Sequence, residues 1–186
     1  MTHLPDHRCG NTAMHLPSRR GVVIALASAA VLSSPSALVA ADGSPEDQQF
    51  MRMAIDEARQ GDYAFGAVIV RDGQVLARGR NLGKTNDDPT AHGEMVAIRR
   101  FLADHGSAAL RGTTLYTSGE PCVMCMGAIV WCGIGRLVFA ASVPQIGARM
   151  NQIMITSAEV AARSSFDPIT ISGGVLANQA MQLFDK

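Results

Sequence analysis

Two short stretches of the chain hold residues that can bind a metal ion and move protons. The first is Thr90–Glu94 (TAHGE), and the second, about thirty residues further on, is Pro121–Cys125 (PCVMC). His92 offers one nitrogen ligand, and Cys122 and Cys125 offer two sulfur ligands. Three protein ligands leave the fourth position of a tetrahedral zinc ion open for water, which a catalytic site requires and a structural site does not.

Glu94 follows the candidate histidine ligand by two residues, close to such a zinc ion but not needed to bind it. Bound zinc lowers the pKa of its water to about 7, so that hydroxide is available at neutral pH. A neighbouring carboxylate can take the proton of the water and later return it to a leaving group. The pattern therefore predicts zinc-assisted hydrolysis, with Glu94 as the proton shuttle.

Each part of this pattern has an ordinary explanation when it occurs alone. A single histidine is commonly a core or surface residue, a C-x-x-C pair can be a redox dithiol or part of a structural zinc site, and a helical glutamate is commonly solvated. Here the histidine, the glutamate and the two cysteines occur together, with Pro121 directly before the first cysteine. This combination favours catalytic zinc over structural zinc and over a redox dithiol.

Residues 1–41 have the layout of a secretory signal peptide. A basic leader is followed by the apolar run Gly21–Val31 and then by small residues up to Ala41. The run is shorter than the roughly 20 residues that span a membrane. We therefore expect an exported protein, periplasmic or secreted, with residues 42–186 as its mature domain. Arg19 and Arg20 are compatible with the twin-arginine route, although paired arginines also occur in ordinary signal peptides.

The size and charge of the chain favour a single domain with a small-molecule substrate. A length of 186 residues with 47% apolar content is enough to build one ordinary core. The formal net charge is zero, and removal of residues 1–41 takes away three Arg and one Asp, which leaves a net charge of −2. The chain thus has no global positive field to attract nucleic acid or an anionic membrane.

Residues 42–186 alternate between short strand patterns and helix patterns. The expected helices cover residues 44–60, 90–104, 121–132, 152–162 and 175–184, and the expected strands cover residues 66–70, 74–77, 113–117, 136–140 and 169–171. This order predicts an α/β domain of three layers, α/β/α, in which a five-stranded mixed sheet has helices on both faces. Pro121 would occupy the first position of its helix, so that Cys122 and Cys125 share one helix face.

The combination H-x-E and P-C-x-x-C is the signature of zinc nucleobase deaminases, and the chain resembles the cytidine and deoxycytidylate deaminase superfamily. The resemblance runs from about Phe50 to Ala141 and includes AFGAVIVRDG, DPTAHGE, LYTSGEPCVMCMGAIVW and GRLVFAAS. Within the superfamily, the chain is most similar to the branch of bacterial guanine deaminase, tRNA adenosine deaminase and fungal cytosine deaminase. The resemblance implies a cytidine-deaminase-like fold, a zinc cofactor and a homodimer with active sites near the subunit interface.

The resemblance also implies three residues that contact the substrate. Asn81, eleven residues before His92, corresponds to an asparagine that hydrogen-bonds the base, and the alternative is an ordinary turn residue. Phe65 is placed where guanine deaminase has an aromatic residue against the purine ring, and the alternative is a core position. Trp131 matches the end of the LGAIYW segment of that enzyme, as a pocket wall or an interface residue.

Two departures from the guanine deaminase pattern bear on the substrate. Gly119 replaces a cysteine, and residues 140–158 contain no Asp or Glu where that enzyme uses an acidic residue, so that Asn151 is the nearest polar substitute. We predict a deaminase of a free nucleobase, nucleoside or related aminated heterocycle, with guanine-like purines favoured over cytosine. The alternatives are a tRNA adenosine deaminase, which would need basic residues to bind phosphates, and a non-catalytic zinc-binding module, which would not need Glu94.

Overall fold

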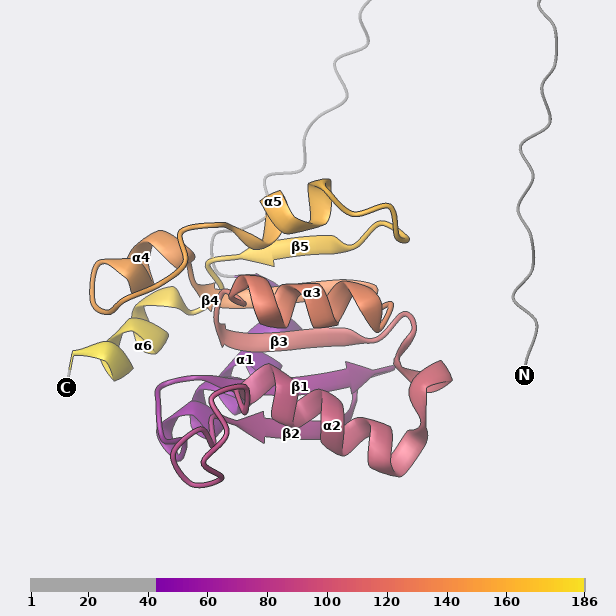
Figure 1. The fold of residues 1–186 in the computed structure, drawn as a ribbon, viewed down its shortest axis with the longest axis horizontal. Coiled ribbons are helices and arrows are strands. Elements are labelled where there is room, and N and C mark those ends of the chain that lie inside the picture. Colours follow the sequence, from indigo (N-terminus) through magenta and orange to yellow (C-terminus); the bar gives the residue numbers. More distant parts are fainter. Residues whose placement is uncertain (1–42, 186) are drawn as a thin grey trace, which may run out of the picture. The chain divides into compact units, whose positions relative to one another are not determined.

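The computed structural model describes residues 43–185, and its centre is a five-stranded sheet with the order β2-β1-β3-β4-β5 (Figure 1). The strands are β1 (Gly66–Arg71), β2 (Gln74–Arg80), β3 (Thr114–Gly119), β4 (Arg136–Ala141) and β5 (Thr170–Gly173). β1 is antiparallel to β2 and β3, whereas β3 is parallel to β4 and β4 to β5. The predicted mixed sheet is confirmed. The predicted signal peptide, residues 1–41, lies outside the described residues.

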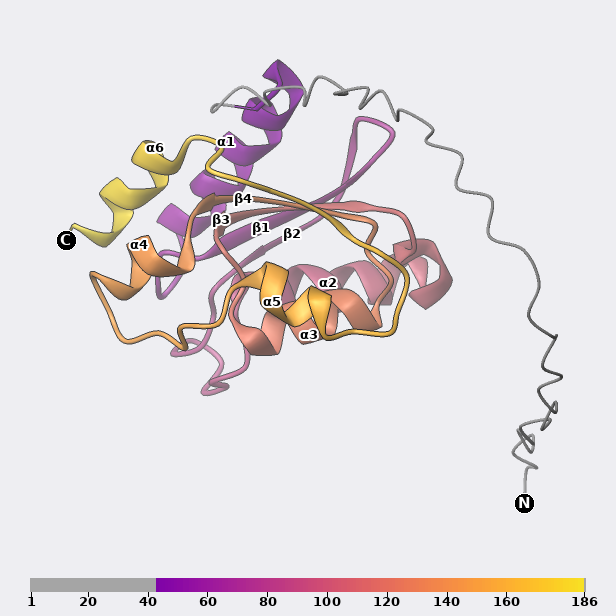
Figure 2. The ribbon, with the colours of Figure 1, turned by 90° about the horizontal axis from the view of Figure 1, so that it is seen from above.

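Helices cover both faces of the sheet, which confirms the three-layer prediction (Figure 2). One face carries α1 (Pro45–Arg59) and α6 (Ala177–Met181), and the other carries α2 (Gly93–His105), α3 (Val123–Trp131) and α5 (Ser157–Ala162). The remaining short elements are α4 (Val143–Gly147) and the 3-10 turns η1 (Ser107–Leu110) and η2 (Gln182–Phe184). Within residues 43–185, no helix combines the length and the apolar character needed to cross a membrane.

The predicted start of α1 and the predicted hairpin turn both follow from local sequence. The Ser44 hydroxyl accepts a hydrogen bond from the Asp47 N–H at 3.0 Å, and the Asp47 carboxylate accepts one from the Ser44 N–H at 3.4 Å. Such a reciprocal capping box satisfies two N–H groups at a helix start. Between β1 and β2, Asp72 and Gly73 have φ values of 49° and 73°. Two successive positive φ values make the tight turn whose twist matches a β-hairpin.

A buried polar cluster joins α1 to the middle of the sheet on the face opposite α2 and α3. The Asp47 carboxylate accepts a hydrogen bond from the Tyr116 hydroxyl at 2.9 Å. It also accepts two from the Arg136 guanidinium, at 2.7 Å and 3.0 Å. The Arg136 hydrogen bond is the largest cause that lowers the pKa of Asp47 to about 2. The cluster therefore contributes a charge-dependent part of the stability of the fold.

Two glycines allow α2 to lie directly on the backbone of the hairpin. A Cβ atom at Gly79 would overlap the carbonyl oxygen of Gly93 and the backbone nitrogen of Ala97. A Cβ atom at Gly93 would lie 2.8 Å from the carbonyl oxygen of Phe65, closer than real Cβ contacts. This backbone contact fixes the first turn of α2, where the H-x-E motif lies.

The prediction was wrong for the connection between β4 and β5. It placed one helix over residues 152–162, whereas the structure has α4 directly after β4 and limits α5 to Ser157–Ala162. Each short helix starts with its own capping box, formed by Ser142 with Gln145 and by Thr156 with Glu159. Local hydrogen bonds of the caps, rather than apolar periodicity, decide where these helices begin. The last expected helix, residues 175–184, is likewise shorter and consists of α6 and η2.

Candidate metal centre and active site

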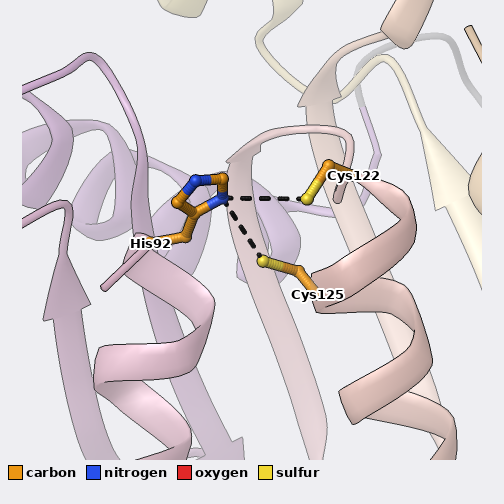
Figure 3. A group of neighbouring side chains, drawn as sticks. All are labelled: His92, Cys122 and Cys125. Carbon is orange, nitrogen blue, oxygen red and sulfur yellow. Dashed lines mark hydrogen bonds between the residues drawn. The ribbon is translucent and has the colours of Figure 1, made fainter. Parts of the chain in front are cut away.

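The three candidate metal ligands converge at the starts of two neighbouring helices. His92 is the N-cap residue of α2 and Cys122 is the N-cap residue of α3, while Cys125 lies in the first turn of α3. Figure 3 shows the imidazole pointing from one helix start to the two thiols of the other. The Nδ1 atom of His92 is 3.7 Å from the Sγ atom of Cys122 and 3.6 Å from the Sγ atom of Cys125.

These separations fit a tetrahedral zinc ion. Bond lengths of about 2.0 Å to nitrogen and 2.3 Å to sulfur place two such ligands about 3.6 Å apart at the tetrahedral angle. The three ligand atoms all lie within 4.8 Å of one another. One imidazole with two thiolates is also a ligand set that zinc prefers. Because the described residues place three ligands in this group, a fourth position is left for a water molecule or a substrate.

Both helices begin slightly later than the sequence indicated. Pro121 precedes the N-cap of α3 instead of occupying its first turn, and α2 starts at Gly93 instead of Thr90. Cys122 and Cys125 still face the same partner because the N-cap and the third helical position lie on one side of the first turn (Figure 3). The shift places the free N–H groups of both helix starts beside the ligands, where they favour thiolate over thiol.

In the metal-free protein, the two thiols are unequal. The hydrogen bond from Cys125 lowers the pKa of the Cys122 thiol to about 4. The same hydrogen bond, together with burial, raises the pKa of Cys125. The hydrogen bond with Cys122 raises the pKa of the His92 imidazole. Cys122 is therefore the more acidic of the two thiols, and zinc binds cysteine in the deprotonated form.

Glu94 lies in the first turn of α2, and only 4% of its surface is exposed. Burial raises the pKa of its carboxyl group to about 7, because the low-dielectric surroundings disfavour the charged form. A carboxyl group that titrates near neutral pH can both accept a proton and return it. Glu94 also lines the cavity that contains the metal ligands His92 and Cys122.

This cavity has a volume of about 700 Å³, and residues from three parts of the chain line it. The starts of α2 and α3 supply His92, Glu94 and Cys122, and the third candidate ligand, Cys125, lies beside His92 and Cys122. The residues before β1 and after β2 supply Phe65 and Asn81. The segment after α4 supplies Met150, Asn151 and Gln152. The structure therefore brings together six of the seven predicted site residues, and it adds Asn151, which the sequence indicated only as a polar substitute.

Contacts with neighbouring residues orient the side chains of Asn81 and Phe65 at the cavity. The side-chain oxygen of Asn81 accepts a hydrogen bond from the Gly83 N–H at 3.0 Å, so the amide NH2 remains available to the cavity. The Phe65 ring stacks on the His92 ring, with centroids 6.4 Å apart, and meets the edge of Phe184 at 5.4 Å.

The absence of a side chain at Gly119 makes room for this arrangement. A Cβ atom at Gly119 would lie 2.9 Å from the Cδ1 atom of Ile146 and 3.1 Å from the Phe65 ring. The replacement of a cysteine at this position is therefore matched by the ring of Phe65, which occupies the adjoining space.

Trp131 is the one predicted substrate-contacting residue that the structure does not bring to the cavity. It is the last residue of α3, at the opposite end of that helix from Cys122, and its surface is 76% exposed. Its ring packs against Phe166 at 4.7 Å, beside a separate surface hollow of about 520 Å³. The expected substrate contact is therefore not found in this chain, and its other expected role, at an interface, stays a prediction.

Sequence reasoning missed Glu120, whose side chain is only 5% exposed and lines the cavity. Its two carboxylate oxygens accept hydrogen bonds from backbone N–H groups of Val143 and Ser157. The signal that could have indicated it was an acidic residue between a buried strand and the first cysteine ligand. Tyr63 and Lys84, at the same cavity, also had no role in the sequence prediction; the Lys84 ammonium lies 4.7 Å from the centre of the Tyr63 ring.

Comparison with known proteins defines the class. Residues 44–141 match the model of the family described as the cytidine and deoxycytidylate deaminase zinc-binding region, and the chain belongs to this family. The family match and the His92, Cys122 and Cys125 group together confirm the predicted zinc cofactor.

Two relatives, a guanine deaminase and a tRNA-specific adenosine deaminase, are similar to this chain over about half of its length. Guanine deaminase of Bacillus subtilis (strain 168) is 43% identical over 99 residues, which cover 50% of this chain and 64% of that protein. The tRNA-specific adenosine deaminase of the same organism is 39% identical over 106 residues, or 55% of this chain and 66% of that protein. The chain thus spans just under two thirds of the length of these two relatives.

A solved structure agrees with this comparison. Guanine deaminase from Nitrosomonas europaea superimposes with a TM-score of 0.64 at 28% identity, over 84% of this chain and 94% of that chain. The predicted resemblance and the predicted cytidine-deaminase-like fold are both confirmed.

Proposed function

We propose that this protein is a zinc-dependent hydrolytic deaminase of a free nucleobase, with a guanine-like purine as the favoured substrate. One observation carries the proposal: three ligands lie at tetrahedral zinc spacing, and two of them, His92 and Cys122, line a cavity of about 700 Å³ together with the buried side chain of Glu94. A purely structural zinc site needs neither an open ligand position nor a buried carboxyl group beside it.

The reaction adds water to a ring carbon and expels the amine of that carbon as ammonia. Zinc held by His92, Cys122 and Cys125 would supply an activated water molecule at neutral pH. Glu94 accepts a proton from that water, transfers it to the ring nitrogen next to the attacked carbon, and carries a second proton to the departing amine. The product keeps the oxygen atom of the water as a ring carbonyl, and the protein ends in its starting protonation state.

The cavity walls support a flat aminated ring as the ligand. The Phe65 ring can lie against such a base, and the free amide NH2 of Asn81 can donate a hydrogen bond to a ring nitrogen or carbonyl oxygen. Asn151, which also lines the cavity, offers both a donor and an acceptor to a bound base. The resemblance to guanine deaminases favours a purine over cytosine.

A tRNA adenosine deaminase is the second candidate, because a tRNA-specific relative is 39% identical. Lys84 and the exposed aromatic ring of Tyr63, both at the cavity, are the residues that would contact a phosphate and a base. The net charge of −2 for residues 42–186 disfavours this candidate. A tRNA-binding protein would show an affinity that falls steeply with salt.

We also propose that the protein is exported and forms a homodimer. Export rests on the composition of residues 1–41, and a reporter fused to the first 45 residues should leave the cytoplasm. Dimerisation is supported by the exposed aromatic pair Trp131 and Phe166. Sedimentation equilibrium should give twice the chain mass, and a monomer at all concentrations would contradict this part of the proposal.

The test of the proposed reaction is ammonia release by purified, zinc-loaded protein. The substrates are guanine, guanosine, adenine, adenosine, cytosine, cytidine and aminated triazines, with Glu94→Ala as the blank. We expect release from guanine or a similar purine that the blank does not show. The absence of ammonia release from every member of this panel, with zinc bound, would refute the proposal of a free-base substrate.

A further inference from the structure

The side chain of Glu120 links two helix starts that are far apart in the sequence. Its Oε2 atom accepts a hydrogen bond from the Val143 N–H at 2.8 Å, and its Oε1 atom accepts one from the Ser157 N–H at 2.8 Å. Val143 is the first residue of α4 and Ser157 is the first residue of α5. One buried carboxylate therefore holds both ends of the intervening segment.

The backbone of Glu120 is fixed to the sheet and to the metal-binding turn. Its N–H donates a hydrogen bond to the Ala141 carbonyl oxygen at 2.7 Å, so the residue extends the pairing of β3 with β4. Pro121 and the metal ligand Cys122 follow directly. The Ser157 hydroxyl adds a contact of 3.4 Å to the Pro121 carbonyl oxygen. Glu120 thus joins the segment between α4 and α5 to the same turn that presents the metal ligand.

The intervening segment forms part of the cavity wall, and its residues after Met150 make few hydrogen bonds to the rest of the fold. It supplies Met150, Asn151 and Gln152 to the cavity. Figure 2 shows the part of the segment between α4 and α5 as a loop. Residues 151–156 have no regular secondary structure. Two of its backbone hydrogen bonds are local, from the Ile153 N–H to the Gln152 side chain and from the Ile155 N–H to the Ile153 carbonyl. The position of this wall therefore depends on how its two ends are held.

Charge and burial make the two hydrogen bonds strong ones. Only 5% of Glu120 is exposed, so water competes poorly for its oxygens. Hydrogen bonds from N–H groups to a carboxylate are charge-assisted, and N–H groups at a helix start carry partial positive charge. Each carboxylate oxygen of Glu120 thus accepts one N–H group from the start of a short helix.

We propose that Glu120 is a positioning residue that holds segment 143–157 against the metal-binding turn and thereby shapes the substrate side of the cavity. The kinetic part of this inference rests on the proposed function, since it assumes that the substrate occupies the cavity. The structural part does not, because the two hydrogen bonds form without a substrate.

The first test is amide hydrogen exchange of the full-length, zinc-loaded protein without substrate. Glu120→Gln can accept one of the two N–H groups but presents its own NH2 to the other, which is left unpaired. We expect exchange in segment 143–157 to accelerate about tenfold, equivalent to about 1.4 kcal/mol, with no acceleration in β1 or β3. Unchanged exchange in the segment, or equal acceleration throughout the sheet, would overturn the proposal.

Glu159→Gln is the matched control. Glu159 is exposed, lies on α5 and accepts hydrogen bonds from the Thr156 N–H and hydroxyl, each at 2.8 Å. Glutamine can replace glutamate in a capping box, so the same change of charge at a residue that also bonds to the start of α5 should leave exchange in segment 143–157 nearly as in the wild type. Acceleration in this variant equal to that of Glu120→Gln would contradict a specific role for Glu120.

The second test is kinetic and uses whichever base the wild-type protein deaminates. Glu120→Gln should raise KM about tenfold, change kcat less than about threefold and leave the zinc content at the wild-type value. A fall in kcat with unchanged KM, or loss of zinc, would overturn the positioning role. If the wild-type protein deaminates no base, the proposed function fails, while the exchange experiment still decides the role of Glu120.

Two further measurements keep the inference testable if Glu120→Gln does not fold. Glu120→Asp keeps the charge, but its side chain is shorter by one methylene group, so its carboxylate does not reach both N–H groups. This variant should show the same acceleration of amide exchange in segment 143–157. In the wild-type protein, the amides of Val143 and Ser157 should exchange at least about tenfold more slowly than those of residues 151–155. Equal exchange rates at all these positions would overturn the inference without any variant.

Discussion

Two walls of one cavity are built in different ways. The metal wall (His92, Glu94, Cys122 and Cys125) lies at the starts of α2 and α3, and backbone contact with the hairpin fixes the start of α2. The segment wall (Met150, Asn151 and Gln152) lies on a loop between two short helices, and Glu120 holds both of its ends. The metal wall is thus fixed by backbone packing, whereas the segment wall is held at both ends by hydrogen bonds to a single side chain.

The largest expected effect is the loss of Glu94 from the metal wall. Glu94→Ala should lower kcat by about 10²- to 10⁴-fold, because proton transfer by a positioned side chain contributes a factor of this size. The zinc content and the melting temperature should stay near the wild-type values, because Glu94 is not needed as a ligand. Retention of more than about a tenth of kcat would show that another group carries the proton.

The next effect concerns the backbone contact that supports the metal wall. Gly79→Ala should lower the free energy of unfolding by about 3 kcal/mol or more, because the new methyl group overlaps the backbone of α2. Chemical denaturation measures this change. Gly127→Ala is the matched control: a Cβ atom there meets nothing within 4 Å, so alanine should be neutral or stabilise α3 by up to about 1 kcal/mol. Equal effects of the two variants would contradict the account of the close contact.

A third prediction uses a region distant from both walls, the Asp47 cluster. The folded pKa of Asp47, about 2, is below its ordinary value of 3.8, so its contribution to stability is present above pH 4 and is lost as the pH falls toward 2. Asp47→Asn should therefore destabilise the protein by about 2 kcal/mol at pH 7, and by much less near pH 2. Denaturation at both pH values measures the difference, with the exposed neighbour variant Glu46→Gln as the control.

The catalytic constants sharpen this third prediction. Asp47→Asn should leave kcat and KM at pH 7 unchanged while the protein is folded, because α1, which carries Asp47, lies on the face of the sheet opposite α2 and α3. A destabilisation that does not depend on pH, or a direct effect on turnover, would refute the role assigned to this carboxylate.

The smallest effect is expected on the segment wall. Asn151→Ala should raise KM for the favoured base about threefold to tenfold, which corresponds to the loss of one hydrogen bond of about 1 kcal/mol. Steady-state kinetics on two bases that differ in one exocyclic group would also show a changed preference between them. An effect on kcat as large as that of Glu94→Ala would remove the distinction between the two walls.

The metal wall could be predicted from the sequence because its geometry is local. H-x-E and P-C-x-x-C each fix their residues within one turn of a helix start, and the helix that follows determines where the side chains point. An error of two residues in the position of Pro121 did not matter, since Cys122 and Cys125 keep the same separation. The strands were also predictable, from short β-branched runs and the Asp72-Gly73 turn.

The segment wall could not be predicted in the same way. Its place in the fold depends on hydrogen bonds that Glu120 accepts from residues 23 and 37 positions away, which no local pattern indicates. Two capping boxes outweighed the apolar residues that suggested one helix over 152–162. The misplacement of Trp131 had a simpler cause: nine residues of helix separate it from Cys122 by about 13 Å along the axis, too far for both to reach one base.

The most direct test of the central claim is a titration of the metal-free protein with zinc, in which bound zinc and ammonia release from guanine are measured together. We predict that turnover rises in proportion to bound zinc and reaches its maximum at one zinc ion per chain. Turnover in the metal-free protein would contradict the zinc-dependent mechanism, and one bound zinc ion per chain without ammonia release would contradict guanine as the substrate.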